Sequence, residues 1–374
     1  MGFLPRKMMT KKSQNNVASS LGLYWFLILI PIVFLLERSN ADPVLTFLGS
    51  ALAIIPLSKL IGESTEALSH YLGSTVGGLM NATLGNAPEI IIGYFALQEG
   101  LVDMVKASIT GSIIANLLIG LGLTFIACGT RGFNKFVRFN FQSYQVHSGV
   151  LTLAVCGLVI PAVFSFTTES ERQISIEISV VLLVIYVLSV VSTFLPKTPD
   201  SDSDDVLEIV RVDDPAHQEP PKWSQNKALF VLVVVTIALA FMSEFMTNSI
   251  APATSAFGLS QLFVGVFILA LLGNVSEFIN GVRFARNGQV ELAIGIFLGG
   301  GSQMALLVAP SLVFLGIYQG QKMDLLFSKY ELIALIITVI SVSKFMGSGR
   351  VKPEIGLGLV SLYIILGIGF YYAC

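Results

Sequence analysis

Gly85-Asn86-Ala87-Pro88-Glu89 is a polar stretch inside a long apolar run, and it recurs 188 residues later (273 against 85) as Gly273-Asn274-Val275-Ser276-Glu277. At that offset six residues recur identically: Leu84, Gly85, Asn86, Glu89, Ile91 and Gly93 reappear as Leu272, Gly273, Asn274, Glu277, Ile279 and Gly281. Each copy lies midway along an apolar segment long enough to cross a bilayer. A carboxylate at that depth costs several kcal/mol unless it has a partner or a function, so Glu89 and Glu277 are predicted to be functional.

The composition is that of a polytopic helical membrane protein. Of the 374 residues, 54% are apolar and only 12% are charged, and the mean hydropathy is +0.78. A soluble domain carries roughly 25% charged residues. The cysteines Cys128, Cys156 and Cys374 lack metal-ligand spacing, so neither a disulfide framework nor a zinc site is predicted. We expect a lipid bilayer around the chain, no nucleic-acid partner and no organic cofactor; the oligomeric state is left open, a homo-oligomer included.

Hydropathy predicts an all-α fold of about eleven transmembrane helices. They cover residues 21–36, 44–69, 74–97, 101–127, 144–166, 173–195, 226–249, 261–285, 290–317, 327–345 and 354–373. Lysine and arginine are concentrated in the segments that are cytosolic if the N-terminus is inside, sixteen residues against six elsewhere. The C-terminus is then expected on the far side. The short N-terminal tail favours a prokaryotic plasma membrane over a vacuolar one.

Eleven spans with one repeat predict one N-terminal helix followed by two five-helix repeats. The units are a cytosolic tail (1–20), the first helix and its loop (21–43), the first repeat (44–196), an acidic cytosolic linker (197–225) and the second repeat (226–374). Because five is odd, the two repeats face opposite directions, as in secondary transporters whose sites lie at the midplane. A chance resemblance of two apolar segments is disfavoured, since the recurring residues are mainly polar or glycine.

Pro88 predicts a break in the third span. Proline lacks an N–H and its ring clashes with the carbonyl of the residue four positions earlier, Leu84. The carbonyls of Leu84 and Gly85 would then lack intrahelical partners, which membrane proteins tolerate where such backbone lines a cavity. Carbonyls beside a carboxylate suit a hard cation such as Ca²⁺, which takes six to eight oxygen ligands. In the second copy a break would depend on Gly273 and Ser276.

Further polar residues accompany the motifs. At the same offset, Gly111-Ser112-Ile113-Ile114-Ala115-Asn116 aligns with Gly299-Gly300-Gly301-Ser302-Gln303-Met304. The polar side chains of these two segments either add oxygens to the cation path or bond neighbouring helices; they are Ser112, Asn116, Ser302 and Gln303. The asparagines of the motifs, Asn86 and Asn274, have the same two interpretations. Glu66 and Glu244, in the leading helices of the repeats, are candidates for proton coupling.

A family resemblance rests on these motifs. G-N-A-P-E-I-I-I-G-Y-F-A-L with G-S-I-I-A-N-L-L-I-G-L-G, and G-N-V-S-E-F-I-N-G-V-R-F-A with L-G-G-G-S-Q-M-A-L-L-V-A-P, resemble the two signature repeats of calcium/proton exchangers of the calcium/cation antiporter superfamily. The resemblance extends from about residue 44 to the C-terminus. It implies exchange of cytosolic Ca²⁺ for protons, with both ions competing for Glu89 and Glu277. It also implies that backbone carbonyls and the residues Asn86, Asn274, Ser112 and Gln303 line the site.

The sequence departs from the family pattern at three places. Phe278 stands where the family usually has histidine, Gly299-Gly300 replaces a glycine-serine pair, and Asn248 replaces a common acid. These departures bear on cation preference and pH dependence rather than on architecture.

The linker between Lys197 and Lys227 is rich in aspartate and proline. It is either a Ca²⁺-attracting regulatory segment or, as we favour, a solvated connector.

The predicted function is therefore secondary active Ca²⁺/H⁺ antiport, with Ca²⁺ as the transported substrate, and not an enzymatic activity. A sodium-driven calcium exchanger is the alternative within transport, although its sites usually have serine or threonine where Asn86 and Asn274 stand. A membrane-embedded hydrolase with two catalytic carboxylates, and a structural or channel protein, are the alternatives from other classes.

Overall fold

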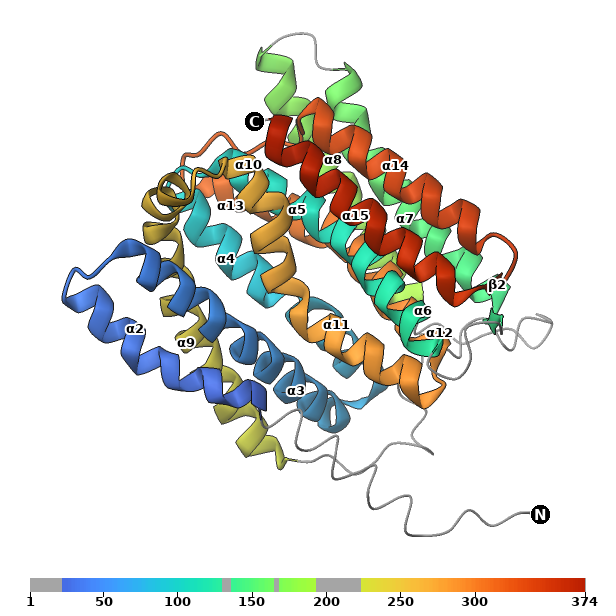
Figure 1. The fold of residues 1–374 in the computed structure, drawn as a ribbon, viewed down its shortest axis with the longest axis horizontal. Coiled ribbons are helices and arrows are strands. Elements are labelled where there is room, and N and C mark those ends of the chain that lie inside the picture. Colours follow the sequence, from blue (N-terminus) through green and yellow to red (C-terminus); the bar gives the residue numbers. More distant parts are fainter. Residues whose placement is uncertain (1–21, 130–135, 165–167, 193–222, 374) are drawn as a thin grey trace.

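The computed structural model describes residues 22–129, 136–164, 168–192 and 223–373, and the described part is almost entirely helical (Figure 1). The helices before the predicted linker are η1 (Trp25–Ile28), α2 (Leu29–Arg38), α3 (Pro43–Leu84), α4 (Ala87–Gln98), α5 (Val102–Ala115), η2 (Asn116–Gly120), α6 (Leu121–Gly129), α7 (Phe141–Phe164) and α8 (Thr168–Ser192). Those after it are α9 (Gln225–Phe257), α10 (Gln261–Phe263), η3 (Val264–Leu269), α11 (Ala270–Asn287), α12 (Val290–Gln303), η4 (Met304–Val308), α13 (Ala309–Tyr318), α14 (Lys329–Met346) and α15 (Pro353–Ala373). The acidic linker lies outside the described residues, so its interpretation stays a prediction.

Eight helical segments in the described part of the chain are long and apolar enough to cross a membrane. The other three predicted spans also coincide with helices, but each of these helices differs from the eight in length, continuity or charge. The segment 22–38 is short, the segment 74–98 is interrupted between α3 and α4, and α14 carries three charged residues. The predicted fold class is thus confirmed at the level of a helical, multi-pass membrane protein.

The sequence determines where the long helices begin and change direction. Asp42 caps α3 by accepting a hydrogen bond from Val44 N at 2.9 Å, and Pro43 occupies the first turn, where a missing N–H costs nothing. Gly73 interrupts α3 with φ 79° and ψ 168°, a conformation open to glycine alone among ordinary residues. The part of α3 after Gly73 is therefore separated from the first part by a change of direction.

Helices from the two halves of the chain pack against each other. α3 runs beside α9, and α15 lies along α6 (Figure 1). α5 packs closely on η3, and α11 contacts α3, α5 and α6. The strands β1 (Val137–Arg138) and β2 (Arg350–Val351) pair antiparallel and join two connecting segments. The polar side chains of the two motifs are buried or half-buried in this bundle.

Three π-helical turns interrupt the central helices: η2, η3 and η4. The turns η2 (116–120) and η4 (304–308) are separated by 188 positions, the offset of the two polar motifs. The sequence contained no signal for them, because an extra residue in one helical turn leaves the apolar composition unchanged. π-helical turns are rare and occur frequently at functional sites.

Candidate cation-binding site

The helix that carries the first motif is broken, as Pro88 predicted. α3 ends at Leu84 and α4 begins at Ala87, with Asn86 between them at φ −97° and ψ 10°. Pro88 is the second residue of α4, where its missing N–H and fixed φ are tolerated. The proline therefore both ends one helix and starts the next.

The break leaves backbone oxygens available. The first backbone bond of α4 runs from Ile90 N to Asn86 O at 3.2 Å. In the described part of the chain, no backbone N–H donates to the carbonyl of Gly85, which lies between the two helices. Glu89 lies in the first turn of α4, so its carboxylate stands at the same break and at the positive end of a helix dipole.

The second motif corrects the sequence prediction. α11 is continuous from Ala270 to Asn287, so the break expected at Gly273 and Ser276 is wrong. Ser276 keeps its N–H and has no ring to clash with the preceding turn, and Gly273 adopts a helical conformation that costs about 1 kcal/mol but does not end a helix. The irregular turn of this span is η3, which precedes the motif.

The two glutamates are each pressed against a glycine. A Cβ atom at Gly273 would lie 3.2 Å from Glu89 Oε1, and one at Gly300 would lie 3.2 Å from Glu277 Oε2. The glutamates are half-buried, yet the Oε2 atom of each is fully enclosed and has no hydrogen-bond partner among the described residues. The carboxylate of the first motif therefore touches the second motif, and both carboxylates retain an oxygen that can accept a cation or a proton.

Two amide pairs connect the halves of the chain around these carboxylates. Asn86 Nδ2 donates to Gln303 Oε1 at 2.7 Å, and Asn116 Nδ2 donates to Asn274 Oδ1 at 3.0 Å. The three asparagines are buried, and Asn116 Oδ1 is enclosed without a partner in the described part of the chain. These contacts bear out the helix-bridging interpretation of the amides, and the Asn116 amide nitrogen lies beside Glu277 Oε2 at Gly300.

A cavity of about 20 Å³ lies beside Glu89, with room for about one water molecule. Its walls include Glu89, Ile109, Ser112, Gly273 and Val308. Six elements contribute to it, namely α4, α5, η3, α11, η4 and α13. Among the described residues there is no cluster of three or more His, Cys, Asp or Glu side chains, so a cation here would depend on two carboxylates and neutral oxygens.

The remaining predicted site residues are distributed unevenly. Ser112 lines the cavity, whereas Ser302 donates its hydroxyl to Leu298 O at 2.8 Å within its own helix. Glu66 is exposed on α3 and Glu244 is half-buried on α9; neither lines the cavity. Their proton-coupling role stays a prediction.

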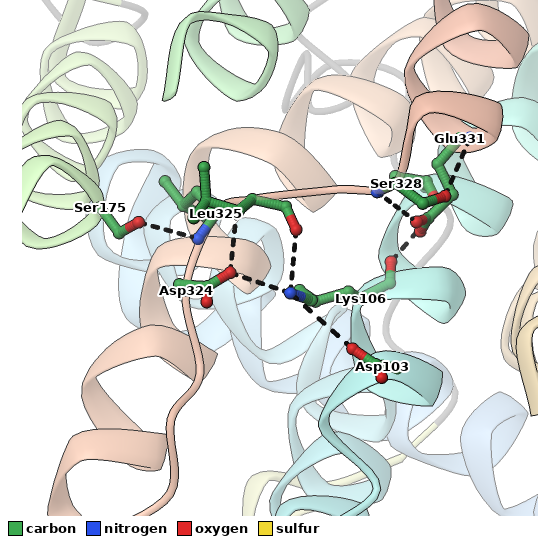
Figure 2. Close-up of polar contacts among 9 residues, drawn as sticks. Asp103, Lys106, Ser175, Asp324, Leu325, Ser328 and Glu331 are labelled. Carbon is green, nitrogen blue, oxygen red and sulfur yellow. Dashed lines mark hydrogen bonds and ion pairs between the residues drawn. The ribbon is translucent and has the colours of Figure 1, made fainter. Parts of the chain in front are cut away.

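One polar network near the site was not predicted. Lys106 of α5 donates to Asp324 Oδ1 and to Leu326 O, both at 2.9 Å, and Figure 2 shows these bonds beside the capped start of α14. One turn along α5, Thr110 donates to Glu331 Oε1 at 2.9 Å. The network fixes the end of α5 remote from Asn116 against the connection between α13 and α14. Only the presence of a lysine in an apolar helix hinted at it.

The chain was compared with known families and proteins. Residues 43–195 and 227–372 match the family described as sodium/calcium exchanger protein. A Ca²⁺/H⁺ antiporter of Aphanothece halophytica is 35% identical over 362 residues, covering 93% of this chain and 96% of the relative. Vacuolar cation/proton exchanger 3 of Oryza sativa subsp. japonica is 33% identical over 347 residues, covering 91% of this chain and 83% of the relative.

A solved structure agrees with the sequence relatives. The structure of native YfkE matches with a TM-score of 0.78 and 31% identity, covering 92% of this chain and 99% of that one. The family match spans both halves of the chain, each with its own polar motif. The chain belongs to the sodium/calcium exchanger protein family.

Proposed function

We propose that this protein is a secondary active antiporter that exchanges cytosolic Ca²⁺ for H⁺ at Glu89 and Glu277. The observation that carries the proposal is that each carboxylate has an enclosed and unpartnered oxygen, and that Glu89 lies against Gly273 of the second motif, beside a helix break and a cavity. The relatives described above are named as a Ca²⁺/H⁺ antiporter and a cation/proton exchanger, which agrees with this chemistry.

The oxygens around the break match the ligand preference of Ca²⁺. The two carboxylates offer four oxygens, and Asn116 Oδ1 offers a fifth. The carbonyls of Leu84 and Gly85 bring the inventory to seven, within the six to eight that Ca²⁺ takes in flexible geometry. The ligands are hard oxygens throughout, without a thiolate or imidazole that would favour a transition metal.

Competition between Ca²⁺ and protons for the same carboxylates would couple the two fluxes. Two ionised carboxylates without a cation are unfavourable in a site of low dielectric, so the return step without Ca²⁺ needs protons on the carboxylates. Binding of Ca²⁺ displaces the protons, and protonation releases Ca²⁺ on the other side. If three protons exchange for one Ca²⁺, net charge crosses the membrane in each cycle. Moving one elementary charge through a membrane potential of 100 mV is worth about 2.3 kcal/mol.

We propose eleven spans arranged as one helix plus two inverted five-helix repeats. The equal offset of the motifs and of the turns η2 and η4 supports the repeat. An odd number of spans per repeat would put the two motifs in opposite orientations around a shared midplane.

The proposed orientation has the N-terminus in the cytosol. β1 and β2, which pair, both belong to segments assigned to the cytosolic side. Tyr71, whose hydroxyl donates to Trp223 O at 3.0 Å, links two further cytosolic segments. On the opposite side, Gln319 donates to Tyr94 O at 3.1 Å near the far-side ends of α13 and α4. We favour a prokaryotic plasma membrane.

The alternatives are weaker. Membership of an exchanger family argues for transport rather than for a hydrolase, which would need catalytic acids but no repeat. Sodium-driven exchange is disfavoured because amides, Asn86 and Asn274, occupy the positions where serine or threonine is usual, and both amides are engaged between helices.

The test is Ca²⁺ uptake into liposomes that contain the purified protein. An imposed pH gradient, acidic inside, is expected to drive accumulation of radioactive Ca²⁺, and a sodium gradient of equal size is not. Ca²⁺ accumulation driven by the sodium gradient alone would show that sodium, not the proton, is the coupling ion. No accumulation with either gradient would contradict the assignment as a transporter.

A further inference from the structure

Phe297 of α12 is held edge to edge between two glycines from different halves of the chain. One edge of its ring lies on Gly120 of η2 and the opposite edge lies on Gly281 of α11; a Cβ atom at either glycine would overlap ring atoms. The ring is fully buried. Phe278 packs against it with a centroid distance of 6.1 Å, so a second aromatic ring supports the first.

This ring lies one helical turn from the Glu277 carboxylate. Gly281 follows Glu277 by four residues on α11, and Gly300 follows Phe297 by three residues on α12, so each pair shares one helix face. Glu277 Oε2 rests against Gly300. Phe297 therefore fills the space between Glu277 and the end of the bundle where α11 ends and α12 begins, which the proposed orientation assigns to the cytosol.

The equivalent position beside Glu89 is occupied by the smaller side chain of Ile109 and adjoins a cavity. Subtracting or adding 188 converts Phe297 and three of the residues near it into residues that line the cavity. The pairs are Phe297 with Ile109, Gly120 with Val308, Gly300 with Ser112, and Glu277 with Glu89. One carboxylate thus has a cavity with room for about one water molecule, and at the matching place the other has a buried aromatic ring.

We propose that Phe297 is the gate that separates Glu277 from the cytosol. The inference rests on the proposed antiport and deepens it by naming the side chain that prevents the site from opening on both sides. With the ring between Gly120 and Gly281, Ca²⁺ bound at Glu277 cannot leave toward the cytosol. Withdrawal of the ring from the two glycines opens that route. Phe278 supports the closed position, which gives a structural role to the residue that departs from the resembled family.

The test compares leak with coupled transport in liposomes. Phe297→Ala is expected to raise downhill Ca²⁺ release in the absence of a pH gradient by about tenfold, equivalent to a barrier lower by about 1.4 kcal/mol. The ratio of Ca²⁺ to protons exchanged should rise with it. Phe297→Ile, which copies the matching residue Ile109, should give an intermediate leak and tests the proposal if the alanine variant does not fold.

Phe125→Ala is the matched control, because Phe125 is equally buried but lies in α6 against Gly356 of α15. It should lose stability without any change in leak or in the exchange ratio. Equal leak in the Phe297 and Phe125 variants, with normal pH-driven uptake by the wild type, would overturn the gate and leave the antiport intact. A wild type without pH-driven uptake would overturn the proposed function and the gate together.

Discussion

Replacing Glu89 or Glu277 by glutamine is expected to abolish pH-driven Ca²⁺ uptake and to stabilise the protein. Each carboxylate has an enclosed oxygen without a partner. An unsatisfied buried polar group costs about 1–3 kcal/mol, and a charged one costs more. Because glutamine removes the charge at nearly constant volume, each variant should gain about 1–3 kcal/mol in the free energy of unfolding.

Two measurements check this prediction. The first is uptake in liposomes; the second is thermal unfolding in detergent with and without Ca²⁺. At a Ca²⁺ concentration one hundred times its dissociation constant, a ligand that binds only the folded state stabilises by about 2.7 kcal/mol. The wild type should gain this increment and lose it when Ca²⁺ is chelated. The Glu89→Gln and Glu277→Gln variants should not gain it.

Glu99→Gln is the matched control, since Glu99 is exposed at the end of α4 and the substitution is chemically the same. It should leave uptake, stability and the response to Ca²⁺ unchanged. Near wild-type uptake by either site variant would remove that glutamate from the site. A loss of stability in both variants would show that the enclosed oxygens have partners in the membrane, and the reasoning from unsatisfied groups would fail.

Three further predictions address the surroundings of the site. Deleting residues 200–219 of the linker should leave maximal transport intact, and any role in attracting Ca²⁺ should appear as a higher KM, most clearly at low ionic strength; complete loss in a well-expressed deletion would contradict this. Phe278→His should strengthen the inhibition of uptake in acid, because an imidazolium beside Glu277 repels Ca²⁺. An unchanged pH profile in a folded variant would show that residue 278 does not affect pH dependence, and the role of Phe278 would be limited to packing on Phe297. Lys106→Met should lower the free energy of unfolding by about 1–3 kcal/mol. This is less than the 3–5 kcal/mol lost when a fully buried ion pair is broken, because the Asp324 side chain is 25% exposed. A double-mutant cycle with Asp324→Asn measures this coupling, and additive effects would refute it.

Local chemistry explains which parts of the site could be predicted. The break at Pro88 follows from a missing N–H and a ring clash within four residues, so the sequence was sufficient. The break expected at Gly273 and Ser276 was wrong for the same reason: neither residue forbids a helix, and the surrounding bundle supports one. A glycine or serine lowers helix propensity, whereas tertiary packing decides the outcome.

Contacts between distant residues could not be predicted from the sequence. Asn86 meets Gln303 and Asn116 meets Asn274 only because the two halves of the chain enclose one site. Phe297 looks like any apolar residue of a membrane helix until Gly120, 177 positions earlier (297 against 120), is found beside it. The sequence signal for this contact was a glycine, but glycines in membrane helices have many possible neighbours.

The single proline also accounts for the difference between the two halves of the site. Pro88 leaves the Gly85 carbonyl without a backbone donor at the break that precedes Glu89, whereas Ser276 keeps α11 intact and its carbonyls bonded within the helix. In the proposed site, backbone ligands would therefore be concentrated on the side of the first motif. The second motif would contribute its carboxylate, with the ring of the proposed gate, Phe297, on the side assigned to the cytosol. Two repeats with matching acids would thus form one site with a ligand-rich half and a gated half, and an antiporter needs such a site to be open to only one side at a time.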